Sequence, residues 1–184
     1  MGKIDSKKQQ SKSNESVILR NATILDVEKL YLLVTEVARS NDFLIVTPEE
    51  YSSISSEQQI ARIKRHHDNE GDVWLIAECN NELIGSIDFQ NGKSKKINHK
   101  GSFGLIVKPS WQNKGIGKLL LSALIEWVKA HSSIEVINLT VSEENKPAIE
   151  LYKKFGFQIT GREPFSLKLQ DGRFLVDLTM TLKL

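Results

Sequence analysis

The sequence contains only one cysteine, Cys79, which excludes an internal disulfide and a cysteine-rich zinc site. No apolar run approaches the ~18 residues that a membrane-spanning helix needs. The N-terminus is polar and lacks the apolar stretch of a secretory signal. We therefore expect a cytoplasmic protein that has no membrane partner.

The chain also carries little net charge, +2 at pH 7. The excess lies in residues 1–16, and the remaining residues hold equal numbers of basic and acidic side chains. Because a nucleic-acid-binding fold normally gathers basic charge on one surface, we expect no nucleic-acid partner. With 184 residues, of which 40% are hydrophobic, the chain is long enough for one domain with its own core.

The first 16 residues have few apolar side chains, so we expect a disordered polar tail at 1–16 and a single domain at 17–184. Gly2 and Ser6 also fit the pattern M-G-x-x-x-S for N-myristoylation. That motif is short, so a plain polar tail is the preferred interpretation. Processing at Gly2 stays open as the alternative.

Hydrophobic periodicity and capping residues predict an α/β domain with a mixed sheet. Strands are expected at residues 17–22, 73–79, 82–89, 102–107, 135–141, 156–160 and 173–182. Helices are expected to begin at Thr23, at Thr47, at Ser56, near Lys114 and near Pro147. Asn80 and Asn81, between two of the strands, indicate a hairpin.

A loop with two glycines, Gln112-Asn113-Lys114-Gly115-Ile116-Gly117, joins a predicted strand to a predicted helix. Glycine lets the backbone approach a ligand and adopt positive φ, and the free N–H groups of a helix start favour an anion. Lys114 and Lys118 add positive charge. The loop thus predicts a phosphate or pyrophosphate site, although a tight turn alone would also need glycines. The nucleotide patterns G-x-x-x-x-G-K-[ST] and G-x-G-x-x-G are absent.

A second motif follows the strand at 135–141. Asn145, Ala148 and Tyr152 are spaced i, i+3 and i+7, so they share one face of a helix. At ~1.5 Å per residue, Asn145 and Tyr152 lie about 10 Å apart along the axis. They can therefore contact two points of one extended ligand. The alternative is that Asn145 only caps the helix and Tyr152 only packs.

Together these two motifs resemble the GCN5-related N-acetyltransferase (GNAT) family, and the likeness in element order covers Val17 to Leu182. The residues that carry it are Val107-x-Pro109-x-x-Gln112-x-x-Gly115-x-Gly117 and Asn145-x-x-Ala148-x-x-x-Tyr152-x-x-x-Gly156-Phe157. The C-terminal segment also resembles branches that acetylate ribosomal-protein N-termini, small amines or antibiotics. The resemblance implies a mixed, mostly antiparallel sheet of six to seven strands, flanked by about four helices and splayed between its fourth and fifth strands.

The resemblance also implies acetyl-CoA as co-substrate and direct attack of a primary amine on the thioester in a ternary complex. It assigns cofactor binding to Leu105, Ile106, Val107, Gln112, Asn113, Lys114, Gly115, Ile116, Gly117, Lys118 and Asn145. It makes Tyr152 the acid that protonates the leaving thiolate. A catalytically silent acyl-CoA-binding sensor or scaffold is the alternative function.

The general base is not evident, because two positions that carry Glu or His in relatives are Gly101 and Phe103 here. His99 has the same strand parity and is the first candidate, although the surrounding segment is loop-like. Glu78 and Asp88 are further candidates, and an ordered water is another.

The identity of the acceptor is not readable from the sequence, and we expect residues 40–60, 90–100 and 161–173 to recognise it, since loops usually carry specificity. No set of His, Asp and Glu has the spacing of a known metal motif, so no metal is expected. The partners expected are acetyl-CoA and an amine, and the protein is expected to be a monomer or a homodimer.

Overall fold

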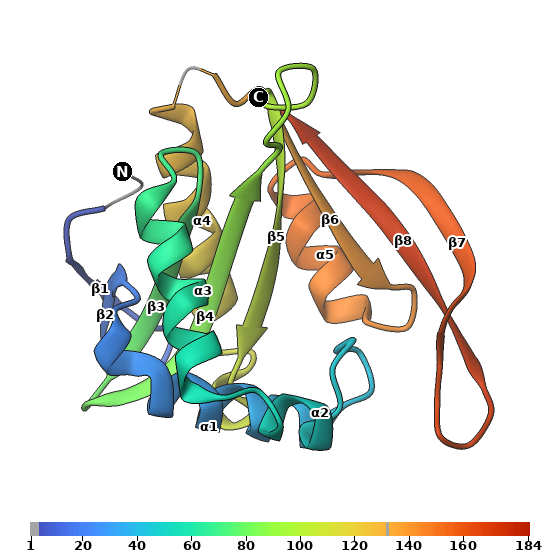
Figure 1. The fold of residues 1–184 in the computed structure, drawn as a ribbon, viewed down its shortest axis with the longest axis horizontal. Coiled ribbons are helices and arrows are strands. Elements are labelled where there is room, and N and C mark those ends of the chain that lie inside the picture. Colours follow the sequence, from blue (N-terminus) through green and yellow to red (C-terminus); the bar gives the residue numbers. More distant parts are fainter. Residues whose placement is uncertain (1–3, 132) are drawn as a thin grey trace.

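The structure is a computed structural model that describes residues 4–131 and 133–184, so Gly2 lies outside the described residues. One sheet runs through the molecule in the order β1-β2-β3-β4-β5-β6-β8-β7 (Figure 1). Its strands are β1 (Lys7–Gln10), β2 (Ser16–Asn21), β3 (Val73–Cys79), β4 (Glu82–Asn91), β5 (Lys100–Val107), β6 (Val136–Ser142), β7 (Gln158–Lys168) and β8 (Phe174–Lys183). The helices are α1 (Val27–Ser40), α2 (Pro48–Ser52), α3 (Ser56–Asp68), α4 (Ile116–Lys129) and α5 (Lys146–Lys154), with short 3₁₀ turns at Ile24–Asp26 and Pro109–Trp111.

The sheet is antiparallel except where β5 and β6 lie parallel. Those two strands pair only from Lys100 to Ser102 on β5, whereas β5 stays paired with β4 as far as Val107. Beyond Ser102 the edge of β5 that faces β6 therefore has no strand partner. This confirms the predicted splay, because β5 and β6 are the fourth and fifth strands when counting starts at residue 17.

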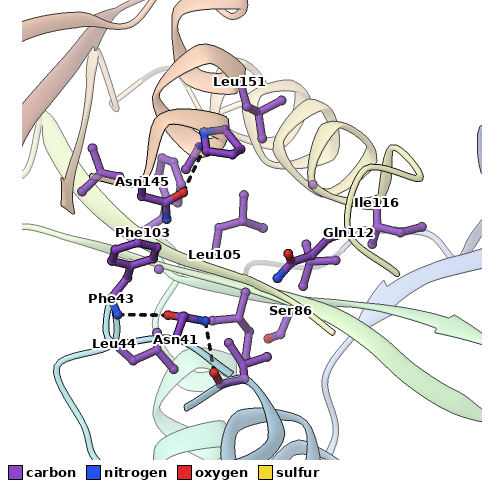
Figure 2. Close-up of a pocket in the computed structure, with 18 of the residues that line it drawn as sticks. Asn41, Phe43, Leu44, Ser86, Phe103, Leu105, Gln112, Ile116, Asn145 and Leu151 are labelled. Atoms are coloured by element: carbon purple, nitrogen blue, oxygen red, sulfur yellow. Dashed lines mark hydrogen bonds between the residues drawn. The ribbon is translucent and has the colours of Figure 1, made fainter. Parts of the chain in front are cut away.

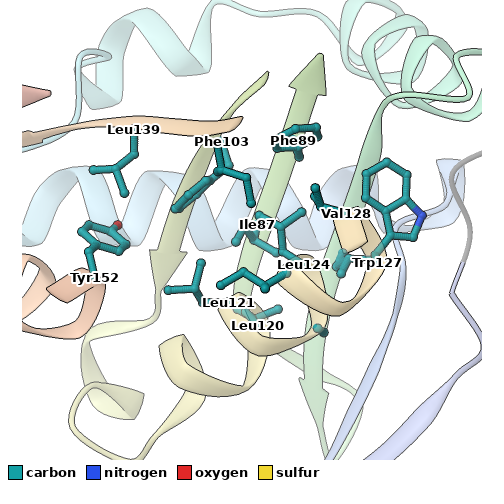
Figure 3. Close-up of a cluster of buried hydrophobic side chains, with 14 of the residues drawn as sticks. Ile87, Phe89, Phe103, Leu120, Leu121, Leu124, Trp127, Val128, Leu139 and Tyr152 are labelled. Carbon is teal, nitrogen blue, oxygen red and sulfur yellow. The ribbon is translucent and has the colours of Figure 1, made fainter. Parts of the chain in front are cut away.

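Helices cover both faces of the sheet, as the near-continuous apolar runs of β3 and β4 require. Alternate residues of β3 face opposite layers: Leu75 packs in the cluster under α4, and Ile76 packs in the cluster under α1 and α3. Leu120 and Leu124 of α4 are fully buried in the first cluster (Figure 3). Burying each such side chain stabilises the fold by about 1.5–3 kcal/mol.

Local signals place most element boundaries where the sequence predicts them. Thr47 and Glu50 form the expected capping box of α2. Asn80 and Asn81 both have positive φ, 48° and 66°, which suits a tight hairpin turn. The cap of α3 is Ser55, one residue before the predicted Ser56, since Ser55 accepts the Gln58 N–H.

Two expectations about disorder and loops were wrong. Residues 7–10 of the expected disordered tail form β1, which pairs antiparallel with residues 16–19 of β2. All four side chains of β1 are exposed, so backbone pairing at a sheet edge suffices there without an apolar pattern. Likewise, the expected loop at 161–173 is mostly strand: β7 continues to Lys168 through two irregularities and projects with β8 from the sheet (Figure 1). Within the described residues, no helix is both long and apolar enough to cross a membrane.

Candidate active site

A cavity of about 1070 Å³ opens where β5 and β6 diverge. Figure 2 shows residues that converge on it from distant parts of the chain: Gln112 and Ile116 from the glycine loop and α4, Asn145 and Leu151 from α5, and Asn41 and Phe43 from the segment after α1. The cavity thus has one wall built by the two sequence motifs and another built by residues 34–62.

The glycine loop approaches the cavity with a backbone conformation that needs glycine. Gly115 has φ of +88° and is the N-cap of α4. A Cβ at Gly117 would lie 3.2 Å from Leu151 Cδ2, so a larger residue would fill the space between α4 and α5. The N–H groups of the first turn of α4 have no acceptor within the helix. Such a cradle fits the phosphates of a nucleotide-like ligand.

Every predicted cofactor residue lines the cavity except Lys114. The residues that do so are Leu105, Ile106, Val107, Gln112, Asn113, Gly115, Ile116, Gly117, Lys118 and Asn145. The Lys114 ammonium instead lies 3.7 Å from a Glu15 carboxylate oxygen and 4.5 Å from the centre of the Trp111 ring. Its charge is therefore already engaged by two side chains.

The free edge of β5 offers backbone donors to the cavity. The Lys108 N–H donates to Ile84 O at 2.9 Å, on the β4 side. Because N–H groups alternate in direction along a strand, the Val107 N–H points away from β4. An extended ligand can pair with such an edge as a further strand would.

Asn145 precedes α5 as its N-cap residue. Its Oδ1 accepts the Ala148 N–H at 3.3 Å, so Asn145 caps the helix, and it also lines the cavity. Tyr152 lines the cavity too, with only 6% of the residue exposed. Its ring packs edge-on to Phe103 at 5.8 Å between centroids (Figure 3). Burial raises the pKa of the Tyr152 phenol, and no described residue hydrogen-bonds its hydroxyl.

The structure does not bring His99 to the cavity. His99 lies in the turn just before β5, where its carbonyl accepts the N–H groups of Glu135 at 2.7 Å and Val136 at 3.1 Å. That end of β5 is still paired with β6, so the splay opens further along the strand. Glu78 also lies elsewhere, since its carboxylate accepts from Arg20 Nε at 3.2 Å.

Asp88, the third candidate, does line the cavity. Its Oδ2 accepts from Arg62 Nη2 at 3.0 Å, and its side chain is 21% exposed. The other oxygen, Oδ1, lies 3.2 Å from where a Cβ of Gly104 would be, beside the free edge of β5. His66, fully buried, places Nε2 3.9 Å from Asp88 Oδ2.

Residues 40–60 contribute to the cavity as expected, among them Asn41, Phe43 and Tyr51, whereas none of residues 90–100 does. Sequence reasoning missed Arg62 and Lys12, which also line the cavity. Neither has a local signal, because each comes to the site from a distant segment.

The model of the acetyltransferase (GNAT) family matches residues 37–157, about two thirds of the chain. The chain belongs to the GNAT family. The match takes in the glycine loop, the free edge of β5 and the Asn145–Tyr152 helix.

Known acetyltransferases resemble the chain in sequence or in fold. The L-amino acid N-acetyltransferase AaaT of Escherichia coli is 32% identical over 98 residues, which are 53% of this chain and 60% of that protein. A GNAT acetyltransferase structure from Streptococcus pneumoniae superposes with a TM-score of 0.86 at 24% identity and covers 91% of this chain and 99% of its own. The yncA structure from Salmonella typhimurium, solved with acetyl-CoA, has a TM-score of 0.78 at 21% identity, covering 91% and 93%.

Proposed function

We propose that the chain is an acetyl-CoA-dependent N-acetyltransferase whose acceptor is a primary amine of a small molecule or of a protein N-terminus. The observation that carries this proposal is that one cavity joins the glycine loop, the free edge of β5, Tyr152 and Asp88. The likeness to an L-amino acid N-acetyltransferase and to a fold solved with acetyl-CoA supports it.

The wall of the cavity that the glycine loop, β5 and Asn145 form suits acetyl-CoA. The N–H groups between Gln112 and Lys118 would hold the pyrophosphate, since a helix N-terminus favours an anion. The backbone of residues 105–107 would pair with the pantetheine amides. The Asn145 side-chain nitrogen, which the cap does not use, would add a donor on the opposite side.

Bound acetyl-CoA supplies an acetyl group activated as a thioester. Asp88 would orient the acceptor amine and take a proton from its nitrogen as the C–N bond forms, in the place that the sequence assigned to His99. The Val107 N–H would donate to the oxyanion that develops on the carbonyl oxygen. Tyr152 would give its phenolic proton to the sulfur as the C–S bond breaks.

The wall opposite the glycine loop favours an amino-acid-like acceptor. Arg62 and Asp88 place one positive and one negative side chain on the cavity, a pair that can face a carboxylate and an ammonium. Apolar side chains surround them, including Phe43, Leu44 and Trp74. L-amino acids are therefore the first acceptors to test, before polyamines and peptides with a free N-terminus.

The test is thiol release from acetyl-CoA with that panel of amines, beside a calorimetric titration with acetyl-CoA alone. We expect acetyl-CoA to bind and at least one amine to support saturable turnover. Binding without turnover on any amine would instead favour the silent acyl-CoA-binding domain. Absence of binding would overturn the proposed function.

A further inference from the structure

The turn between β1 and β2, residues 11–15, rests on the glycine loop although it lies a hundred residues away in sequence. The Lys12 N–H donates to Lys114 O at 2.9 Å, and Glu15 faces the Lys114 ammonium. The side chain of Lys12 runs over Gly115: a Cβ there would lie 3.2 Å from Lys12 Cγ and 3.8 Å from its Cε. Lys12 is thereby part of the cavity wall at the end that the glycine loop forms.

The turn that presents Lys12 is held in a defined shape by Ser11. The Ser11 Oγ is buried and accepts the N–H groups of Ser13 at 3.2 Å and Glu15 at 3.1 Å. The Ser11 N–H in turn donates to Glu15 O at 3.0 Å. At the far end of the hairpin, Lys7 pairs with Glu126 of α4 at 3.0 Å. Lys12 is therefore positioned by the fold, even though its side chain is exposed.

The ammonium groups of Lys12 and Lys114 differ in whether other side chains already engage them. Lys114, which the sequence assigned to the phosphates, is engaged by Glu15 and by the Trp111 ring. Within the described part of the chain, the Lys12 ammonium has neither an ion pair nor a hydrogen-bond partner. An unpaired ammonium beside a helix N-terminus is suited to a phosphate, to which it gives a charge-assisted hydrogen bond.

We propose that Lys12 binds a phosphate of acetyl-CoA, so that the β1–β2 turn forms part of the co-substrate site. The inference rests on the proposed function, because it takes acetyl-CoA as the ligand of the glycine loop. The phosphate can be the pyrophosphate or the 3′-phosphate, which share this chemistry and which the test below separates.

The experiment compares Lys12→Gln with Lys8→Gln, which removes the same charge from an exposed residue of β1 outside the cavity. Calorimetric titration of the full chain with acetyl-CoA should show a loss of affinity of roughly 3- to 30-fold for Lys12→Gln, which is less than a fully buried charge-assisted hydrogen bond would give because Lys12 is exposed. Lys8→Gln should stay within about twofold of wild type, and Lys12→Arg should retain most of the affinity.

Acetyl-dephospho-CoA, which lacks the 3′-phosphate, identifies the partner. If Lys12→Gln weakens its binding as well, Lys12 binds the pyrophosphate; if it does not, Lys12 binds the 3′-phosphate. Equal affinity of wild type and Lys12→Gln for acetyl-CoA would overturn the proposal, and so would tighter binding by the variant, which would make Lys12 an obstruction. If the wild type itself does not bind acetyl-CoA, the proposed function fails instead.

Discussion

Arg62 donates a hydrogen bond of 3.0 Å to the Asp88 carboxylate, and this pair faces the cavity next to the free edge of β5. Asp88 is thus oriented by a partner on α3 while its other oxygen lies against Gly104. The Asp88 carboxylate is therefore held on the face of the sheet opposite to α4 and α5, where an acceptor amine can reach it.

We expect Asp88→Asn to lower kcat/KM for the acceptor amine by about 10²-fold or more, because the amide cannot take a proton from the amine. Affinity for acetyl-CoA should change less than about twofold, since Asp88 lies outside the glycine loop. Steady-state kinetics and acetyl-CoA titration measure the two effects.

Glu78→Gln is the matched control for Asp88→Asn. Glu78 is also a carboxylate that accepts from an arginine, Arg20, but it does not line the cavity. The turnover of Glu78→Gln should match that of the wild type. Equal losses in the two variants would mean that Asp88 matters for the fold and takes no part in the reaction.

The left-handed glycines allow a separate test of the loop. Gly115 and Gly172 have φ of +88° and +86°, so alanine at either position is strained by about 1–2 kcal/mol. Of these two glycines, Gly115 lines the cavity and Gly172 does not, and a Cβ at Gly172 would meet nothing within 4 Å. We expect Gly115→Ala and Gly172→Ala to lose similar amounts of thermal stability. Only Gly115→Ala should also bind acetyl-CoA about tenfold more weakly, a loss of ~1.4 kcal/mol in binding free energy. Unchanged affinity would remove the loop from the ligand site.

The parts of the fold that could be predicted are those with local signals. The apolar runs of β3 and β4 and the stripe of α4 allow little other than buried elements, and the splay beside β5 followed from the family resemblance. By contrast, β1 has no apolar pattern and forms because β2 offers it an unpaired edge. Backbone pairing of this kind leaves no mark on side-chain composition.

The site shows the same division. Gln112, Gly115 and Tyr152 lie in contiguous motifs that predict a shared site, and all three line the cavity. Lys12 and Arg62 reach the cavity through tertiary contacts with Gly115 and Asp88, and nothing near them in sequence indicates a ligand. His99 was misplaced because strand parity gives the face of a residue but not its distance from the splay.

Tyr152→Phe separates chemistry from packing. The phenol has no hydrogen-bond partner among the described residues, so its removal should leave the melting temperature unchanged or slightly higher. The ring contacts with Phe103 and Phe157 remain. We expect kcat to fall roughly ten- to a thousandfold, with little change in acetyl-CoA affinity. Wild-type kcat in this variant would restrict Tyr152 to packing or to positioning the ligand.

The burial of the His66 imidazole predicts how the stability of the fold depends on pH. Burial lowers the pKa of the His66 imidazole, which outweighs the opposing influence of Asp88. Its Nδ1 lies 2.9 Å from Arg62 O, so in the neutral ring this nitrogen carries the proton and donates. The unfolded chain binds a proton at about pH 6.5, whereas the folded chain does so only at lower pH. The contribution of the neutral His66 ring to the free energy of unfolding is therefore complete above about pH 6.5. It is lost as the pH falls through the lowered pKa that His66 has in the folded state.

We accordingly expect the melting temperature of the wild type to fall between pH 7.5 and pH 5.5, and we expect His66→Gln to show a shallower fall. The variant should be less stable at pH 7.5, because glutamine replaces a fully buried ring that packs on Trp74. His131→Gln is the control, since His131 also contacts a helix carbonyl, Trp127 O, but is partly exposed. Its pH dependence should match that of the wild type. If the melting temperature of His66→Gln fell with pH as steeply as that of the wild type, other groups would cause the acid sensitivity. His66 could then take up a proton beside Asp88 without loss of stability.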